Sequence, residues 1–409
     1  MHPTLNTDDE LLIEHLPVDR PSLRVAVVTE TYPPEVNGVA LTLQQLLQRL
    51  QARNHQIRLV RPRQPAHDGP WNAPGSLEQA ELLVRSLPVP RYPQLRMGLP
   101  MKRALLAQWT RQRPDLVHVA TEGPLGWSAV QAARKLRLPV STDFRTNFHA
   151  YTQHYGLGWL RKPMAAYLRR FHNLADCTMV PSADLRDELS AQGFERLLLV
   201  GRGIDTVRFD PARRSEALRA PWGVAPDQPV LLWVGRLARE KNPELFIRCW
   251  AAMRMARPDL RLVVVGDGPA REVLAQACPD AVMAGARHGD DLAAHYASAD
   301  LFVFPSVTET YGNVTPEALA SGLAVLAFGY AAAAERIRHE DNGLLVPRGD
   351  DAAFIEQAVR LARDPALVAS LRRRARTTTL TCGWDTVAAQ VEGIWQGLAA
   401  QPRGQLRPL

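Results

Sequence analysis

The chain has 409 residues, 46% of them hydrophobic and 22% charged, and it carries a formal net charge of +7. This length accommodates two domains of ordinary size, each with its own core, and the composition is typical of a globular protein in water. No stretch comes near the roughly 20 consecutive apolar residues that span a bilayer. Four widely spaced cysteines form no metal or redox pattern, which argues against a disulfide scaffold and predicts a reducing, cytoplasmic location.

Charge is unevenly distributed along the chain. Residues 1–22 are rich in Asp and Glu and lack the basic and apolar regions of a signal peptide, so we expect a disordered extension. Residues 51–175 hold 19 basic and only 6 acidic groups. A field of this sign suits the anionic inner face of a membrane or an anionic lipid acceptor, while an Arg-rich composition without a partner stays open. Nucleic acid is not expected, because no binding motif accompanies the charge.

Short β-branched runs alternate with amphipathic segments of helix length, a pattern typical of parallel sheets covered by helices. The strands expected in the first half are Val25–Val28, Gln56–Val60, Leu116–Val119, Val140–Asp143 and Cys177–Pro181. Those expected in the second half are Val230–Val234, Arg261–Gly266, Ala281–Met283, Leu301–Pro305 and Ala324–Ala327. The segment 202–223, rich in Pro, Gly and charge, marks a boundary between them. We therefore predict an α/β protein with two Rossmann-like domains, 23–205 and 206–383, which face each other across a cleft.

A dinucleotide-dependent oxidoreductase is the obvious competitor for such a chain. Neither domain, however, opens with Gly-x-Gly-x-x-Gly after its first strand. Gly266-Asp-Gly268 matches this motif only in part and fits a tight turn equally well.

Two carboxylates stand eight residues apart in the segment 304–322, between a predicted strand and a predicted helix. Thr315 is a suitable helix N-cap and Pro316 suits the first helical position, so Glu317 should lie in the first turn and Glu309 on the preceding loop. Exposed amides at such a helix start suit a diphosphate, and carboxylates suit sugar or ribose hydroxyls. A capped helix with two surface acids is the plainer interpretation.

Four further landmarks occur in order around this pair. They are Thr29-Glu-Thr-Tyr-Pro-Pro-Glu-Val-Asn-Gly38 after the first strand, Ser141-Thr-Asp-Phe-Arg-Thr-Asn-Phe-His149, Val234-Gly-Arg-Leu-Ala-Arg-Glu-Lys-Asn242 and Leu262-Val-Val-Val-Gly-Asp-Gly-Pro269. Together with the paired acids, they resemble the retaining GT-B glycosyltransferases of family 4. The resemblance covers most of residues 24–395. It implies an acceptor-side first domain, a second domain that binds a nucleotide sugar, and a closing helix within 384–409 that returns to the first domain.

Arg236 and Lys241 follow the first strand of the second domain, and Gly235 allows close approach of the backbone. An Arg fork and a Lys point charge suit two phosphates, whereas exposed cations at a helix start are disfavoured by the helix dipole. In the family that this chain resembles, the matching Arg and Lys bind the pyrophosphate of the donor.

The resemblance also implies the remaining donor contacts. Glu317 would hold the ribose hydroxyls, and Glu309 would contact the hydroxyls of the donor sugar. Gly38 looks like the glycine that lets a loop of the first domain approach the diphosphate, where a side chain would collide with it. The other donor-binding positions are Tyr311, Gly312, Asn313 and Val314, through their backbone, and Met283, at a strand end near the base.

One position departs from the family pattern. Many relatives have Phe-His-Thr where this chain has Phe144-Arg145-Thr146, and that His lies beside the reacting sugar. Arg145 could instead hydrogen-bond the donor or an acidic acceptor. His149 and His118 are weaker acceptor-side candidates, because a lone His is as often structural.

No Asp-x-Asp triplet and no metal-ligand spacing is present in the sequence, so we expect neither a metal nor another cofactor. Arg, Lys and backbone amides would then stabilise the leaving diphosphate. The resemblance implies transfer of a hexose, with mannose from GDP-mannose as the leading donor, to a lipid-type or glycan acceptor with retained configuration. A UDP-sugar-dependent glucosyl- or sulfoquinovosyltransferase, a non-catalytic nucleotide-sugar-binding protein and a GT-B epimerase are the alternatives.

The acceptor side carries mixed apolar and cationic segments. Arg161, Lys162, Arg169 and Arg170 share a predicted helix with Met164, Tyr167 and Leu168. Such a helix can lie on an anionic lipid surface or pack on its own domain. The sequence does not indicate the oligomeric state.

Overall fold

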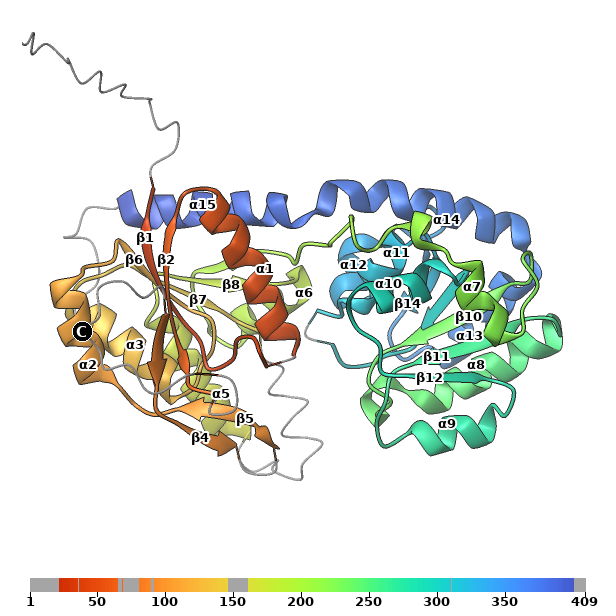
Figure 1. Cartoon of the computed structure of the whole chain (residues 1–409), viewed down its shortest axis with the longest axis horizontal. Helices are drawn as coiled ribbons and strands as arrows, with labels where there is room; N and C mark the ends of the chain where they lie inside the picture. The colour runs from red at the N-terminus through yellow and green to blue at the C-terminus, as the bar shows by residue number, and fades with distance from the viewer. Residues whose placement is uncertain are drawn as a thin grey trace, which may run out of the picture.

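In the computed structural model, the described residues are 22–35, 37–64, 68, 81–89, 92–145, 161–309 and 311–400. The predicted N-terminal extension (apart from Ser22), His149 and the end of the chain after 400 lie outside them. The described chain forms two α/β domains that lie side by side, and a long C-terminal helical segment runs along both (Figure 1).

The first domain contains a seven-stranded sheet with the order β3-β2-β1-β6-β7-β8-β9, in which every neighbouring pair is parallel. Its strands are β1 (Arg24–Val28), β2 (Gln56–Pro62), β3 (Glu81–Val84), β6 (Leu116–Val119), β7 (Val140–Asp143), β8 (Cys177–Val180) and β9 (Leu197–Leu199). Its helices are α1 (Gly38–Ala52), α2 (Lys102–Arg111), α3 (Pro124–Lys135), α5 (Arg161–Asn173) and α6 (Ala183–Ala191). An antiparallel ribbon of β4 (Ser86–Val89) and β5 (Tyr92–Gly98) is added to this domain.

The second domain repeats this design with a six-stranded parallel sheet in the order β12-β11-β10-β13-β14-β15. Its strands are β10 (Val230–Val234), β11 (Arg261–Val265), β12 (Val282–Gly285), β13 (Leu301–Phe304), β14 (Ala324–Phe328) and β15 (Leu344–Val346). Its helices are α7 (Glu216–Arg219), α8 (Pro243–Ala256), α9 (Arg271–Ala277), α10 (Gly289–Ala297), α11 (Val314–Ala320), α12 (Ala331–Arg336), α13 (Asp351–Arg363) and α14 (Pro365–Thr379).

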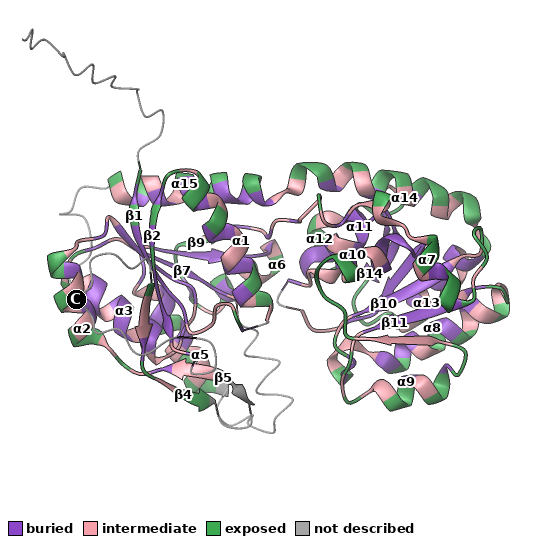
Figure 2. Ribbon diagram, in the orientation of Figure 1, coloured by how far each residue is buried: buried purple, intermediate pink, exposed green. Residues whose placement is uncertain are grey.

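All ten predicted strands are present, with ends within two residues of the prediction. The sequence missed β3, β4, β5, β9 and β15, which are short or lie at sheet edges and carry little periodic signal. The central strands are buried on both faces (Figure 2). In β10, for example, Leu231 and Trp233 enter one core cluster while Leu232 and Val234 enter the cluster on the opposite face, as the two-residue period of a strand requires.

The last helix, α15 (Trp384–Ala400), belongs spatially to the first domain although its sequence follows the second (Figure 1). Trp384, Val391 and Trp395 are buried in one cluster with Leu43 and Leu46 of α1. The His55 ring lies 3.1 Å from the Glu392 carboxylate. The helix α15 thus packs against α1 and the start of β2.

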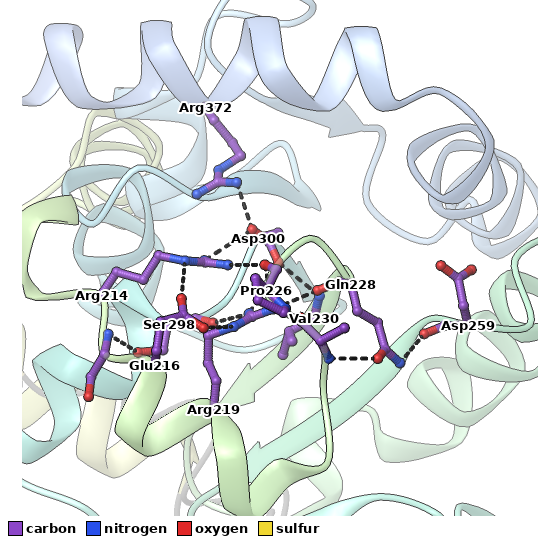
Figure 3. Close-up of polar contacts among 12 residues, drawn as sticks. Arg214, Glu216, Arg219, Pro226, Gln228, Val230, Asp259, Ser298, Asp300 and Arg372 are labelled. Carbon is purple, nitrogen blue, oxygen red and sulfur yellow. Dashed lines mark hydrogen bonds and ion pairs between the residues drawn. The ribbon is translucent and has the colours of Figure 1, made fainter.

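A buried polar network holds the edge of the second sheet at which its central strands begin (Figure 3). Asp300, directly before β13, accepts hydrogen bonds from the backbone N–H of Val230 at 2.9 Å, from Arg372 at 2.6 Å and from Arg214 at 3.3 Å. Arg219 is fully buried and donates to the carbonyl oxygen of Ser298 at 2.8 Å. Because these residues lie at the amino ends of β10 and β13, they stabilise the domain at the edge opposite the candidate site.

Candidate active site

The order of the strands reverses between β1 and β6 in the first sheet, and between β10 and β13 in the second. In open α/β sheets, ligands bind beyond the carboxyl ends of the strands at this point. The loops that leave β10 and β13 carry Arg236, Lys241 and Glu309. The loop that leaves β1 leads to Gly38 at the start of α1. The topology therefore brings the predicted residues of both halves to the edges at which such sites form.

The β10 loop turns sharply at Gly235, whose φ of +145° is accessible to glycine. Arg236 is exposed and forms an ion pair with Glu240. Lys241 is largely buried and forms an ion pair with Glu309, 68 positions along the chain. Its ammonium also lies 5.6 Å from the centre of the Phe304 ring. Lys241 and Glu309 thus hold two separate loops together.

Glu309 lies over a pocket whose lining includes Ser306, Tyr311 and Tyr330. The Ser306 hydroxyl donates a hydrogen bond to the Glu309 carboxylate at 2.7 Å. Gly312 has a φ of +89°, and a Cβ there would lie 3.2 Å from Cγ of Glu309. Both the conformation and the space at Gly312 therefore favour glycine.

The structure corrects the predicted start of the next helix. We expected Thr315 as the N-cap and Pro316 as the first helical residue, but α11 begins at Val314 with Asn313 as its N-cap. Thr315 is buried and contributes to packing instead. Pro316 is tolerated because the first amides of a helix need no intrahelical partner, and Glu317 still lies in the first turn.

Glu317 lies in the first turn of α11, in contact with Tyr296 of α10. Its carboxylate accepts a hydrogen bond from the Tyr296 hydroxyl at 3.1 Å. Burial raises the pKa of Glu317 to about 7, although the Tyr296 bond and the charge of Arg208 act in the opposite direction. A carboxyl group that titrates near neutrality can change its hydrogen-bonding role with pH.

One of the predicted donor-side glycines is placed differently from expectation. Gly38 is not in a turn but is the first residue of α1, capped by the Asn37 side chain through the N–H groups of Val39 and Ala40. A Cβ at Gly38 would meet no atom within 4 Å, so the fold itself does not require glycine there. Met283 lies in β12 and packs partly against the core of the second domain.

Arg145 follows β7 and is paired with Asp143. Its Nε donates to the Asp143 carboxylate at 2.6 Å, and its Nη2 lies 2.5 Å from the same oxygen. The His118 Nε2 atom lies 3.3 Å from that oxygen, and its Nδ1 lies 2.9 Å from the Ser141 hydroxyl. Burial tends to raise the pKa of Asp143, but the charges of Arg145 and His118 outweigh it and hold the pKa below its usual range.

His118 is fully buried, and its ring centre lies 5.3 Å from that of Trp395 on α15. It therefore acts in the described structure as a support for Asp143 and, through it, for Arg145.

Sequence reasoning overlooked Arg202, which lies on the segment that leaves β9. Its Nη1 donates to the Asn313 side chain at 3.2 Å, and its guanidinium lies 5.5 Å from the centre of the Tyr311 ring. The Tyr311 hydroxyl in turn accepts a hydrogen bond from Arg336 at 3.1 Å. Its signal in the sequence is a lone Arg between Gly201 and Gly203, at the start of the segment that predicts the interdomain boundary.

Within the part of the chain that the structure describes, no group of three or more His, Cys, Asp and Glu side chains could hold a metal ion. The described helices also include none that is long and apolar enough to cross a bilayer. The apolar side of α5 packs on its own domain through Leu168 and Phe171, while Lys162, Arg169 and Arg170 are exposed. These exposed cations are the charged groups that the described part of this helix offers to a membrane surface.

Two Rossmann-like domains with acids and cations at their strand ends define a GT-B glycosyltransferase. Comparisons with known proteins agree: the family model described as "Glycosyltransferase Family 4" matches residues 36–208, and "Glycosyl transferases group 1" matches residues 228–364. The chain is 34% identical over 389 residues to a GDP-mannose-dependent alpha-mannosyltransferase of Mycobacterium tuberculosis (strain CDC 1551 / Oshkosh), covering 92% of this chain and 97% of that protein. The chain therefore belongs to glycosyltransferase family 4.

Two further likenesses concern a protein sequence and a solved structure. The sulfoquinovosyl transferase SQD2 of Arabidopsis thaliana is 29% identical over 399 residues, covering 94% of this chain and 76% of that protein. The solved structure of a sucrose-phosphate synthase from Thermosynechococcus elongatus matches with a TM-score of 0.72 at 20% identity, covering 92% of this chain and 99% of that one. The latter likeness concerns the fold alone.

Proposed function

We propose that this glycosyltransferase moves a hexose from a nucleotide sugar to a lipid-type or glycan acceptor, with mannose from GDP-mannose as the leading donor. The observation that carries the proposal is the convergence of Lys241 and Arg236 with Glu309 at the switch point of the second sheet. The similarity over nearly the whole length of a relative named for GDP-mannose favours that donor. A UDP-sugar is the second candidate, favoured by the similarity to the sulfoquinovosyl transferase.

In the proposed reaction, the bond between the anomeric carbon and the diphosphate breaks while the acceptor hydroxyl oxygen bonds to the same face of that carbon. The proton of the acceptor passes to an oxygen of the departing diphosphate. Arg236 and Lys241 stabilise the charge that develops on this leaving group, a task for which preorganised cations are well suited. Glu309, released from its contact with Lys241 by the diphosphate, accepts hydrogen bonds from the donor sugar.

The donor is tested by thermal unfolding with GDP-mannose, UDP-glucose and an ADP-sugar in turn. A ligand that binds only the folded state raises the melting temperature of the protein. We therefore expect GDP-mannose to raise the melting temperature and the ADP-sugar to change it little. A rise with UDP-glucose alone would favour the second candidate. No rise with any of these nucleotide sugars would contradict the proposal.

Catalysis and stereochemistry need a separate experiment with acceptor lipids. We expect a product with the anomeric configuration of the donor, read from NMR couplings, and undiminished transfer in the presence of EDTA. Inverted configuration would refute attack from the leaving-group face. Donor turnover to an isomeric nucleotide sugar without acceptor would indicate an epimerase, and binding without any turnover would indicate a binding protein.

Attachment to an anionic membrane surface is also proposed, from the exposed cations of α5. Sedimentation with vesicles that contain anionic lipid should recover the protein in the pellet, whereas neutral vesicles should not. Failure to sediment with either would contradict attachment without affecting the proposed reaction.

A further inference from the structure

A second pocket lies between the first domain and the start of α15. Its lining comes from α1, from the ends of β7 and β8 and the residues that follow them, from the segment after β9, and from the start of α15. Among the described residues that line it, Arg145 and Arg202 are cations and Asp143 is the single acid. The three charged groups of the proposed donor site, Arg236, Lys241 and Glu309, do not line it, so this pocket is a separate feature.

Among the described residues, Arg202 is buried without an ion pair of its own. The residue is only 8% exposed, and its Nη1 bonds to a neutral amide oxygen of Asn313. Its Nε atom has no hydrogen-bond acceptor among the described residues. Burial lowers the pKa of Arg202 to about 10, helped by the positive charge of Arg145, so the guanidinium stays charged at neutral pH. A buried charge without a partner is costly unless another group compensates it.

Arg145 is itself a cation and cannot compensate the charge of Arg202. Asp143 is a single carboxylate, and Arg145 already contacts it. Both Arg145 contacts end on a single oxygen of Asp143, which His118 also approaches. Arg336 adds a further guanidinium behind Arg202, because its Nη2 donates to the Arg202 carbonyl oxygen at 3.2 Å. Among the described residues that line the pocket, two guanidinium groups therefore stand against one carboxylate, in a place that solvent barely reaches.

We propose that Arg145 and Arg202 together bind an oxyanion of the substrate, namely a carboxylate, sulfonate or phosphate, in addition to the diphosphate of the donor. Two guanidinium groups offer the forked donors that such groups accept. This inference rests on the proposed function, because the anion would arrive as part of a substrate bound in the cleft.

Two neighbours place the anion close to the transferred sugar. Asn313, which Arg202 contacts, lies between Glu309 and Glu317 in the donor loop. Thr42 lines the same pocket one helical turn beyond Gly38. The oxyanion can therefore belong to C6 of an acidic donor sugar or to the acceptor. If the donor sugar is neutral, as in the leading proposal, the oxyanion belongs to the acceptor.

Titration calorimetry distinguishes these sources. In the donor arm, GDP-mannuronate is compared with GDP-mannose, and UDP-glucuronate with UDP-glucose. In the acceptor arm, the protein is first saturated with the nucleotide that it binds, GDP or UDP. Then sn-glycerol 3-phosphate is titrated into this complex. We expect tighter binding of the acidic sugar in the first case, or binding of glycerol 3-phosphate but not of glycerol in the second. Either result identifies the source of the oxyanion.

The variants Arg145→Gln and Arg202→Gln should weaken binding of the effective anion by about tenfold or more, since each removes charged hydrogen bonds. Arg202→Lys should restore part of it, and Arg239→Gln, which changes an exposed cation elsewhere, should leave it unchanged. Affinity for GDP or UDP should survive in all of these variants and reports their correct folding.

Nucleotide binding without any anion preference, or an anion preference that both Gln variants retain, would overturn this inference alone. Absence of nucleotide binding to the unaltered protein would overturn the proposed function and this inference with it.

Discussion

The ionisation of Glu317 gives the sharpest prediction about the donor site. If its carboxylate accepts hydrogen bonds from both ribose hydroxyls, the donor binds chiefly to the ionised form. With a pKa of about 7 in the free protein, about a tenth of the molecules are ionised at pH 6 and about nine tenths at pH 8. Affinity for the donor should therefore fall about tenfold from pH 8 to pH 6.

The pH has the opposite effect on folding stability: the stabilising contribution of Glu317 falls as the pH rises. Because the pKa of Glu317 in the folded state lies above its ordinary value of 4.5, its contribution to the free energy of unfolding is greatest below pH 4.5. It is lost as the pH rises through about 7. Donor binding, which favours the ionised form, should recover part of this loss.

The assay is calorimetric titration of an intact nucleotide sugar between pH 6 and 8. A nucleotide sugar is preferable to GDP or UDP, because a terminal phosphate itself titrates near pH 6. Glu317→Gln should bind more weakly and with little pH dependence. Glu30→Gln is the matched control, since burial also raises the pKa of Glu30 to about 7 but in the first domain. A flat profile in the unaltered protein, or an unchanged slope in Glu317→Gln, would refute the assignment of Glu317.

Three further predictions concern binding, catalysis and stability. Gly38→Ala should leave the free energy of unfolding within about 0.5 kcal/mol of its original value, because the added Cβ meets no atom within 4 Å, yet it should weaken donor binding at least about tenfold in calorimetry; unchanged binding would remove Gly38 from the site. Lys241→Met should lower kcat/KM by about 10²-fold or more, whereas Arg239→Met, an exposed cation on the same loop, should change it less than about twofold; equal losses would mean that only general charge matters. Asp300→Asn should cost about 3–5 kcal/mol in urea unfolding, because it removes the negative charge beside the fully buried Arg219. Asp351→Asn, from an exposed pair, should cost less than about 1 kcal/mol, and similar costs would contradict the role of the Asp300 network.

Some features followed from short stretches of sequence because their causes are local. A parallel strand that is buried on both faces consists of consecutive apolar residues. Such a run, for example Val230–Val234, can be recognised in the sequence alone. The loops after such strands meet at one edge of the sheet, so the proximity of Arg236 and Glu309 to the site could be expected before any coordinates. The start of α11 could not be predicted in this way, because Thr315 is an equally good capping and core residue and its burial is decided by packing.

The sequence by itself determined the two-domain α/β design, the family and the residues to inspect, since these depend on periodicity and on motifs within single loops. Only the tertiary structure decided which charges meet: Lys241 with Glu309, and Arg202 beside Arg145 in the pocket at the start of α15. It also decided that His118 is covered by Trp395. The physical reason is that charge pairing and burial depend on distances between segments far apart in the chain, which the packing of whole domains and of α15 sets.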